Sequence, residues 1–570
     1  MMRFFNSVFL LWLLASSVSA QAILAGQRAH PVSAQNAVVV TSHKVASEVA
    51  LQILKQGGNA VDAAVAAGFA LAVTQPRSGN IGGGGFMLIS PAKSQNVVAI
   101  DYREKAPAKA TQDMFLDAAG NVDKSRSRFS HLSAGVPGTV AGLLLALEEY
   151  GSLSLPVIMA PAIKLAEQGF EVPNRFVQGL EQRSATLQKW PASLKKFYKT
   201  QGASYQVGDI FKQPKLAQTL KRIVANGRAG FYQGKTADLL VAEMQRHGGL
   251  ISHQDLKNYQ AKIREPATGQ YRGFDIFSMS PPSSGGAHIV QILNLLEPYP
   301  IGKYGHNSAQ TIHLMSEAMR LAYADRAAYL GDSDFVKVPL SGLMSKKYAQ
   351  ALTAQINPDK ATPSQQVRAG SPEDYESNET THFSIVDSWG NAVSNTYTLN
   401  FSYGSGIVVP GAGFLLNNEM DDFSAKPGVA NAYGLLGGEA NKIVGNKRML
   451  SSMSPTIVKK DGANFLVTGS PGGSRIISTT LQVIMNVIDH DMNIQSAVNV
   501  PRIHHQWWPD EIRMEQGVSA DTIKLLEKMG HKVVVKSAMG GSQSILIDLE
   551  NDARFGAADP RQSTSKALGY

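Results

Sequence analysis

A change of pattern between residues 350 and 400 constrains the fold of this 570-residue chain more than any other feature. Residues 350–379 are rich in Gln, Ser, Pro and acidic side chains, which predicts an exposed, weakly ordered linker. After it, residues 380–400 and 456–468 alternate as β-hairpins, and a helix is expected from 474 to about 488. Before it, apolar residues recur at helical spacing between Gly/Pro turns, which predicts helices at residues 140–149, 215–226 and 309–329.

Two helices and a glycine run are expected near the N-terminus. Apolar residues spaced from position 43 predict a helix that Gly57 ends. Asn59 can cap the next helix, whose small side chains would let it lie close to a sheet. The Gly82–Gly85 run lacks the Gly-Lys-Ser/Thr of a phosphate loop, so we expect close backbone packing at the start of a strand.

Composition excludes several kinds of chemistry. The chain has no cysteine, which excludes thiol nucleophiles, thiolate metal sites, iron–sulfur clusters and disulfides. The formal net charge of +9 comes from scattered Lys and Arg without a basic block, so no nucleic-acid partner is expected. No His-Glu-x-x-His pair occurs, and the adjacent side chains of His504 and His505 diverge, so we expect no metal and no cofactor.

The first twenty residues have the layout of a secretory signal peptide. Arg3 precedes an apolar stretch, and small residues end the segment at Ala20, so cleavage is expected before Gln21. The apolar stretch is shorter than the ~20 residues of a membrane span, and no later stretch is apolar enough to be one. We therefore expect an exported protein, periplasmic or secreted, with no membrane span.

Without cysteine, the nucleophile has to be sought among hydroxyl groups. No Gly-x-Ser-x-Gly elbow occurs, but the polar linker delivers Thr380 to the start of a strand. If the Glu379–Thr380 bond were cut, Thr380 would carry an α-amine with a pKa of about 7.7–8 beside its hydroxyl, so nucleophile and general base would share one residue. An ordinary strand start is the alternative.

Two further features fit hydroxyl chemistry. In the second arm of the first hairpin, Ser394, Thr396, Thr398 and Asn400 share one parity, so a single strand face would carry hydroxyls and an amide. The Gly469–Gly473 run precedes a helix, where backbone N–H groups of consecutive glycines could stabilise an oxyanion. A plain strand-to-helix turn is the alternative for the glycines.

From Ala37 to Tyr570 the chain resembles the bacterial gamma-glutamyltranspeptidases, which are N-terminal-nucleophile hydrolases. The resemblance implies an α/β (α+β) fold of the four-layer αββα sandwich type, which the alternation of helices and hairpins permits. It rests on residues 57–64, 79–86, 101–104, 281–286, 376–384, 416–423, 450–456 and 469–475.

The resemblance implies a catalytic cycle that begins with self-cleavage. The precursor would cut itself between Glu379 and Thr380, and the large subunit 21–379 and the small subunit 380–570 would form a heterodimer in one interwoven fold. Thr380 would attack the γ-carbonyl of glutathione or another γ-glutamyl amide, and water or the amine of an amino acid or peptide would resolve the ester. Thr398 corresponds to a threonine that hydrogen-bonds the nucleophile, and Gly472 and Gly473 correspond to the oxyanion hole.

The resemblance also implies a donor pocket that carries both signs of charge. Arg103 would bind the donor's α-carboxylate with Ser451 and Ser452, a geometry suited to two-pronged contact. Asp422 would bind the α-ammonium, with Asn400 and Glu419 beside it. Judged without the resemblance, Arg103 and Asp422 would be ordinary exposed charges.

Two residues depart from close bacterial relatives, which often have Gln at these places. Glu379 precedes the cut and could change the rate of self-cleavage, and Glu419 adds negative charge to the pocket and could change donor affinity. Residues 427–448, with Tyr433, resemble a lid loop that would limit the access of water.

Two other functions remain open on the sequence. One is a cephalosporin-type acylase of the same fold that acts on glutaryl amides, whose substrates lack the α-ammonium. The other is a non-catalytic exported binding protein that keeps the pocket and never matures. The preferred acceptor, the ratio of hydrolysis to transfer and the pH optimum do not follow from the sequence.

Overall fold

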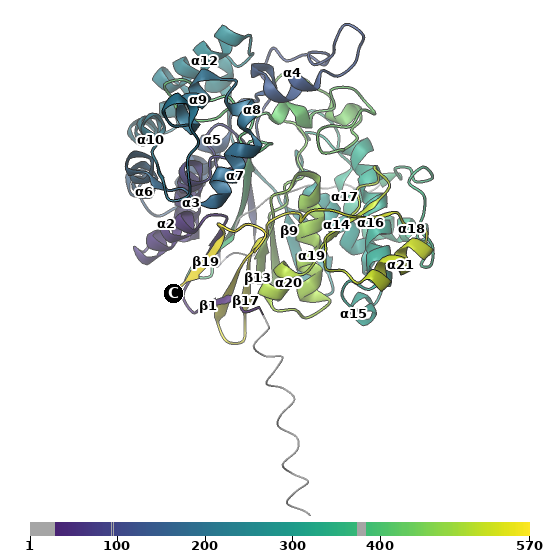
Figure 1. Cartoon of the computed structure of the whole chain (residues 1–570). Helices are drawn as coiled ribbons and strands as arrows, with labels where there is room; N and C mark the ends of the chain where they lie inside the picture. Colours follow the sequence, from purple (N-terminus) through teal and green to yellow (C-terminus); the bar gives the residue numbers. More distant parts are fainter. Residues whose placement is uncertain (1–28, 93, 95, 373–383) are drawn as a thin grey trace, which may run out of the picture.

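A computed structural model describes residues 29–92, 94, 96–372 and 384–570. Within these residues two seven-stranded sheets face one another, and helices cover the outer face of each (Figure 1). The predicted signal peptide 1–20, Glu379 and Thr380 lie outside the described residues.

One sheet carries the first predicted hairpin at its centre. All its neighbouring strands are antiparallel, and β10 and β11 form the hairpin, in which Asp387 Oδ1 accepts hydrogen bonds from the N–H groups of Trp389 and Asn391. The order across the sheet is β19 (Lys566–Gly569), β2 (Val38–Thr41), β10 (Ser384–Val386), β11 (Ala392–Thr398), β3 (Gly84–Ser90), β4 (Val98–Tyr102) and β7 (Lys262–Arg264).

The second sheet carries the second predicted hairpin. Asp461 and Gly462, which join β12 to β13, have φ of 51° and 80°, as a tight hairpin turn requires. The order is β1 (Val32–Ala34), β18 (Ala553–Ala558), β17 (Gln543–Asp548), β13 (Ala463–Thr468), β12 (Thr456–Lys460), β9 (Phe274–Ser278) and β8 (Ala267–Tyr271). In both sheets, strands from before residue 380 lie beside strands from after it.

Three apolar clusters define four layers, which confirms the predicted αββα sandwich. Phe86 and Leu88 of one sheet pack with Ile457 and Val467 of the other between the sheets. One outer cluster joins the first sheet to α2 (Lys44–Lys55), α3 (Ala60–Thr74), α5 (Thr139–Tyr150), α6 (Leu155–Gln168) and α10 (Pro214–Asn226). The other joins the second sheet to α14 (Gly285–Leu296), α16 (Ala309–Tyr329), α18 (Lys346–Thr353), α19 (Ile476–Ile488), α20 (Ile494–Asn499) and α21 (Ala520–Lys528).

The remaining elements lie around this frame, and most of them are short. The helices are α4 (Lys124–Phe129), α7 (Asn174–Gln182), α8 (Ser184–Leu187), α9 (Pro191–Phe197), α11 (Ala229–Tyr232), α12 (Gly234–His247), α13 (His253–Asn258), α15 (Ile301–Tyr304) and α17 (Leu340–Met344). The strands are β5 (Phe170–Glu171), β6 (Ile210–Phe211), β14 (Ile503–His504), β15 (Ile512–Met514) and β16 (Val533–Val535). None of the helices in the described part of the chain is both long and apolar enough for a membrane span.

The predicted helix start at Asn59 is confirmed. Its side chain accepts hydrogen bonds from the N–H groups of Val61 and Asp62, and Asp62 Oδ2 accepts one from the Asn59 N–H at 2.8 Å, which completes a capping box. The small residues of α3 are buried on every side of the helix. Tyr397 of β11 donates a hydrogen bond to the Gly68 carbonyl at 2.9 Å, so the helix does lie close to the sheet.

The glycine run at residues 82–85 packs as predicted. An ideal Cβ at Gly83 would lie 1.9 Å from the carbonyl oxygen of Thr398, and one at Gly85 would lie 2.4 Å from that of Thr396. Any side chain here would push β3 away from the end of β11. The glycines therefore fix the position of the strand end that carries the hydroxyl groups.

The predicted linker is exposed over much of residues 354–372, as expected, but it is packed onto the fold at several points. Ser364 and Val367 are buried, and the Gly370 N–H donates to Asp325 Oδ1 of α16 at 2.8 Å. Polar composition did not reveal this packing, because the acceptors that hold the segment lie far away in the sequence. Residues 373–379 lie outside the described part.

Candidate active site

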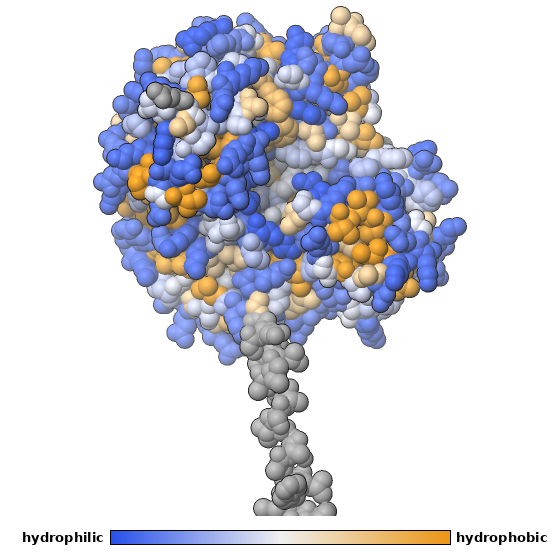
Figure 2. Space-filling model, in the orientation of Figure 1, coloured by the Kyte–Doolittle hydropathy of each residue, from blue (hydrophilic) through white to orange (hydrophobic). Residues whose placement is uncertain are grey.

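A cavity of about 550 Å³ opens where β11 ends. Figure 2 shows the surface hollowed beside α7, whose C-terminal end lines the cavity. Every predicted site residue in the described part of the chain lines it: Arg103, Thr398, Asn400, Glu419, Asp422, Tyr433, Ser451, Ser452, Gly472 and Gly473.

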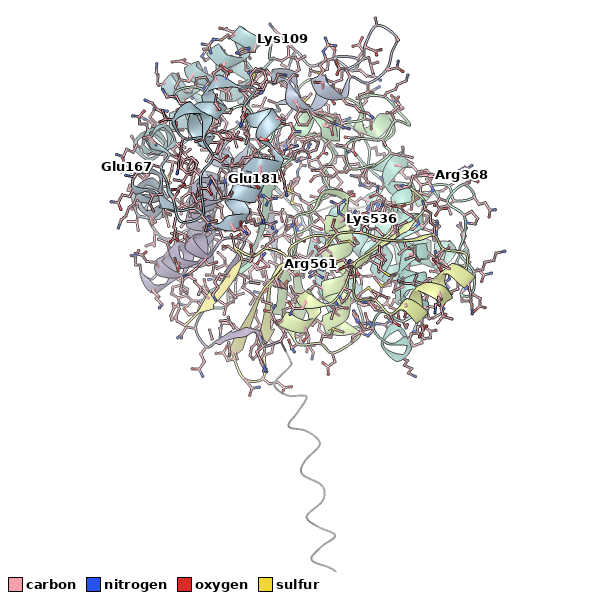
Figure 3. All side chains as sticks on the ribbon, viewed as in Figure 1. Lys109, Glu167, Glu181, Arg368, Lys536 and Arg561 are labelled. Carbon is pink, nitrogen blue, oxygen red and sulfur yellow. The ribbon has the colours of Figure 1, made fainter. Side chains whose placement is uncertain are left out.

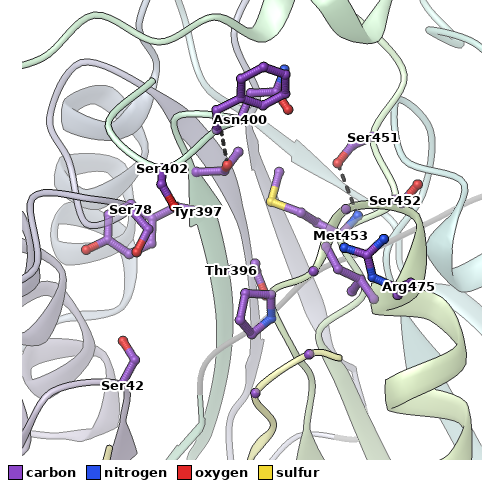
Figure 4. Close-up of a pocket in the computed structure, with 18 of the residues that line it drawn as sticks. Ser42, Ser78, Thr396, Tyr397, Asn400, Ser402, Ser451, Ser452, Met453 and Arg475 are labelled. Atoms are coloured by element: carbon purple, nitrogen blue, oxygen red, sulfur yellow. Dashed lines mark hydrogen bonds between the residues drawn. The ribbon is translucent and has the colours of Figure 1, made fainter. Parts of the chain in front are cut away.

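The end of β11 presents Thr398 to the cavity, but the predicted strand face is shorter than expected. Ser394 points between the sheets, where its Oγ donates towards the carbonyl of Thr468. Asn400 lies beyond the strand with φ of 72°, so the prediction that it continues the strand face is wrong. Its N–H instead donates to Thr398 Oγ1 at 2.7 Å and fixes that hydroxyl (Figure 4).

Gly472 and Gly473 form the turn before α19. Their φ values of 144° and 60° suit glycine, and an ideal Cβ at Gly473 would lie 2.5 Å from the ring of Tyr433. Among the described residues, neither glycine N–H donates a hydrogen bond to a protein acceptor. Two such backbone N–H groups at the wall of a cavity could form an oxyanion hole.

Arg103, which follows β4, is surrounded by carboxylates. Its Nη1 lies 2.7 Å from Glu419 Oε2 and 3.4 Å from Glu104 Oε2, and its Nη2 lies 2.6 Å from Asp422 Oδ2. The side chains are 1% exposed for Arg103 and 16% for Asp422, so the interpretation of these two as exposed charges is wrong. Arg103 and Asp422 tolerate burial because each neutralises the other.

Burial without enough positive charge shifts the acids of this cluster. It raises the pKa of Glu104 to about 7 and raises the pKa of Glu419, while Arg103 opposes both shifts. One oxygen of each glutamate has no hydrogen-bond partner among the described residues. Burial also raises the pKa of Asp422. A single guanidinium therefore serves three carboxyl groups, and the number of protons they hold sets the local charge.

Two serines and another arginine line the cavity near Arg103, whose Nε donates to the Met449 carbonyl at 3.2 Å. Ser451 lies beside the cis Pro281–Pro282 segment, because its N–H donates a hydrogen bond to the Pro282 carbonyl at 2.8 Å. Arg326 of α16 donates to Ser452 Oγ at 3.2 Å and is buried. Sequence reasoning missed Arg326 and Glu104. Glu104 adjoins Arg103 in a quoted block, whereas no signal distinguishes Arg326 within its helix.

The loop that contains Tyr433 reaches across the cavity. Tyr433 Oη donates to the Asn400 carbonyl at 3.0 Å, and Gln506 Nε2 donates to the Tyr433 carbonyl at 3.2 Å. Burial raises the pKa of the Tyr433 phenol, which keeps it a donor. The ring thus joins the strand end to the Gly473 turn.

The histidines of the pair at 504 and 505 have separate partners. His504 Nδ1 lies 2.8 Å from Ser478 Oγ, and His505 Nε2 lies 3.3 Å from Asp510 Oδ1. Two other groups bring histidines near a glutamate, and none of their members lines the cavity. These groups are His131, Glu243 and His247, and His313, Glu317 and His531.

Comparisons with known proteins assign the class. The chain superposes on the cephalosporin acylase from Bacillus halodurans with a TM-score of 0.83 at 26% identity, over 95% of this chain and 97% of that one. On the Helicobacter pylori gamma-glutamyltranspeptidase the TM-score is 0.58 at 48% identity, over 60% of this chain and 97% of that one. Fold and neighbours are those of the N-terminal-nucleophile hydrolases.

The family follows from the sequence matches. Residues 46–569 match the model of the gamma-glutamyltranspeptidase family. The chain is 53% identical over 541 residues to a glutathione hydrolase proenzyme of Escherichia coli strain K12, over 95% of this chain and 93% of that protein. The chain belongs to the gamma-glutamyltranspeptidase family, a family of enzymes.

Proposed function

We propose that this chain is a self-processing gamma-glutamyltranspeptidase and glutathione hydrolase. One observation carries the proposal: the Arg103–Asp422 ion pair lines the same cavity as Thr398 and the free N–H groups of Gly472 and Gly473. A γ-glutamyl group carries a carboxylate and an ammonium on its α-carbon, so both ends of the ion pair match it.

In maturation, Thr380 acts on its own peptide bond. Its Oγ attacks the carbonyl carbon of Glu379, the C–N bond breaks, and the nitrogen stays on Thr380 as a free α-amine. Water then hydrolyses the resulting ester. The products are residues 21–379, once the signal peptide has been removed, and residues 380–570. Glu379, where close bacterial relatives often have Gln, affects the rate of this step and not which bond is cut.

In the catalytic cycle, the α-amine of Thr380 takes the proton of its own hydroxyl as Oγ attacks the donor's γ-carbonyl. The N–H groups of Gly472 and Gly473 stabilise the oxyanion. The leaving amine receives the proton, and a γ-glutamyl ester remains on Thr380. Water or an amino-acid or peptide amine then attacks the ester and restores the hydroxyl. Thr398 orients the nucleophile through its Oγ1.

Donor binding replaces the ion pairs that Arg103 makes with Glu419 and Asp422 by pairs with the donor's two charged groups. The donor's α-carboxylate takes the Nη groups of Arg103 together with the hydroxyls of Ser451 and Ser452. Its α-ammonium takes Asp422, with the Asn400 side chain and Glu419 nearby. Tyr433 then covers the bound group and limits the access of water, so an amine acceptor competes better for the ester.

The proposal extends to location and assembly. The N-terminal layout directs the chain to export, and the mature protein is periplasmic or secreted. The two fragments stay together as a heterodimer, since strands of both lie side by side in each sheet. Glutathione, other γ-glutamyl donors and amine acceptors are its small-molecule partners, and the cycle uses no cofactor.

The acylase likeness makes glutaryl amides the second candidate substrate. A glutaryl group lacks the α-ammonium, so it would leave Asp422 without its partner. Rates on γ-glutamyl and glutaryl p-nitroanilide, compared in the purified wild type, separate the two. We expect kcat/KM to favour the γ-glutamyl donor by about a hundredfold; a preference for glutaryl would assign an acylase, and no turnover of either would favour the non-catalytic binding protein.

A further inference from the structure

Three arginines line the cavity wall away from the Arg103 cluster. Arg77 follows α3, Arg175 lies in α7 and Arg183 ends α7. Arg77 Nη2 donates to Ser402 Oγ at 3.1 Å, and Arg183 Nε donates to the Ser402 carbonyl at 3.0 Å. Figure 4 shows Ser402 and Ser78 on one side of the cavity and Ser451, Ser452 and Arg475 on the other.

These three arginines have no acidic partner in the described part of the chain. Among the described residues none of the three forms an ion pair, whereas Arg103 alone has three acidic partners. All three are half-buried, and burial lowers the pKa of each guanidinium. The charge of Arg77 lowers the pKa of Arg175 further, which means that the two repel one another.

The whole cavity has an excess of positive charge. Among the described residues, its lining includes the arginines 77, 103, 175, 183, 326 and 475 and two carboxylates, Glu419 and Asp422. Both carboxylates are already bonded to Arg103. Half-buried, uncompensated guanidinium groups are costly unless a bound anion pairs with them, and their fork geometry suits a carboxylate.

A chain of ring contacts connects this wall to the reacting end of the cavity. The guanidinium of Arg183 lies 5.5 Å from the centroid of the Phe401 ring, and that ring lies 5.9 Å from the ring of Tyr433. Tyr433 in turn contacts the Gly473 turn. The arginine wall therefore borders the place where the donor's γ-carbonyl would lie, on the side away from the α-carbon pocket.

We propose that Arg77, Arg175 and Arg183 form an anion subsite for a free carboxylate on the peptide joined to the γ-glutamyl group. The inference rests on the proposed function and adds a substrate class to it. A leaving peptide with a C-terminal carboxylate is bound at both ends, by Arg103 and by this wall. An acceptor peptide enters the same space, so its carboxylate meets the same three arginines.

The test removes the carboxylate without touching the reacting bond. Glutathione is compared with glutathione whose glycine carboxyl is an amide, and wild-type kcat/KM should favour free glutathione by about tenfold, mostly through KM. Raising the ionic strength should shrink this ratio. A wild-type ratio near one overturns the subsite for the leaving peptide, whatever the variants do.

Three variants locate the effect: Arg77→Met, Arg175→Met and Arg183→Met. Each should lower the ratio of the two donors by a larger factor than it lowers kcat/KM for γ-glutamyl p-nitroanilide, whose leaving group carries no carboxylate. Arg126→Met, which removes an exposed arginine of α4 outside the cavity lining, should leave the ratio as in the wild type. A ratio unchanged in all three variants that retain anilide activity contradicts the assignment.

A second arm separates leaving group from acceptor. With γ-glutamyl p-nitroanilide as the donor, transfer to a dipeptide is compared with transfer to its C-terminal amide. A carboxylate effect in either arm supports the subsite and identifies which peptide uses it, and no effect in either arm overturns it. Absence of wild-type activity on the anilide would instead contradict the proposed function, so the two failures are distinguishable.

Discussion

At the scale of single residues, the proposed donor pocket depends on how three carboxyl groups share Arg103. Glu419 already forms an ion pair with the Arg103 guanidinium, so its carboxyl group is not simply free to bind the donor's α-ammonium. Its pKa and that of Glu104 are raised by burial, the latter to about 7. A protonated glutamate is neutral, so the negative charge beside Arg103 grows as the pH rises through 7. That added charge opposes the carboxylate of an incoming donor.

Glu419→Gln should therefore change the pH dependence of donor binding. In the wild type, KM for γ-glutamyl p-nitroanilide should rise by about three- to tenfold between pH 6 and pH 9, because the coupled glutamates lose protons. The variant removes one of the two groups, so its KM should rise less and should be lower at pH 9. KM measured at each pH, with kcat alongside, checks this.

Glu439→Gln is the matched control for this prediction. Glu439 is exposed and pairs only with Lys442 outside the cavity lining, so its variant should follow the wild-type curve. If Glu419→Gln also follows that curve, then Glu419 does not set the charge that the donor meets.

The sequence could predict only part of this pocket from the residues themselves. Arg103 and Asp422 look like exposed charges when each is taken alone, because what permits their burial is a partner more than three hundred positions away. Only the resemblance to a family predicted that these two residues line the same pocket. Arg326 and the three arginines at the far wall lacked any local signal, since a charged residue is ordinarily solvated.

At the scale of elements, the helix caps and hairpins could be predicted because their signals are local. The capping partners of Asn59 lie within three residues of it. The Asp461–Gly462 sequence favours a tight turn because these residue types tolerate positive φ. The packing of residues 354–372 could not be predicted, because it comes from side chains of α16 such as Asp325. The position of Asn400 could not be predicted either, because its positive φ ends the strand, and the alternation of residue types in a sequence gives no information on φ.

The substitution Gly473→Ala should displace both the Gly473 turn and the Tyr433 loop. The new Cβ would overlap the Tyr433 ring, and φ of 60° adds backbone strain. We expect kcat for γ-glutamyl p-nitroanilide to fall by about a hundredfold, as for the loss of an oxyanion donor. Steady-state kinetics and a thermal melt of the same sample provide the measurement.

Gly305→Ala separates backbone strain from the collision. Gly305 has φ of 86°, and an ideal Cβ there has nothing within 4 Å. Its melting temperature should fall less than that of Gly473→Ala, because only backbone strain is added, and its kcat should stay near the wild-type value. Equal kcat in the two variants would show that contact with Tyr433 does not matter.

At the scale of the whole molecule, each sheet is built from both sides of residue 380. β10 and β11 lie between β2 and β3 in one sheet, and β12 lies beside β9 in the other. A cut at one peptide bond leaves every one of these ladders intact. The two fragments share the core between the sheets, so neither could bury its apolar face alone.

The processed fragments should therefore remain one particle without a covalent link. Gel filtration in native buffer should give a single peak at the elution volume of uncut Thr380→Ala protein, while a denaturing gel of that peak gives two bands. Elution of separate fragments in native buffer would contradict the interleaved assembly.

In the proposed mechanism the chain activates its own threonine by breaking one bond. The most direct measurement is N-terminal sequencing of the smaller band of purified wild-type protein, beside Thr380→Ala and Thr381→Ala. We predict the sequence Thr-Thr-His-Phe-Ser for the wild type, cleavage at the same bond in Thr381→Ala, and a single uncut band for Thr380→Ala. A different N-terminus in the wild type, or cleavage of Thr380→Ala at that bond, would contradict this mechanism.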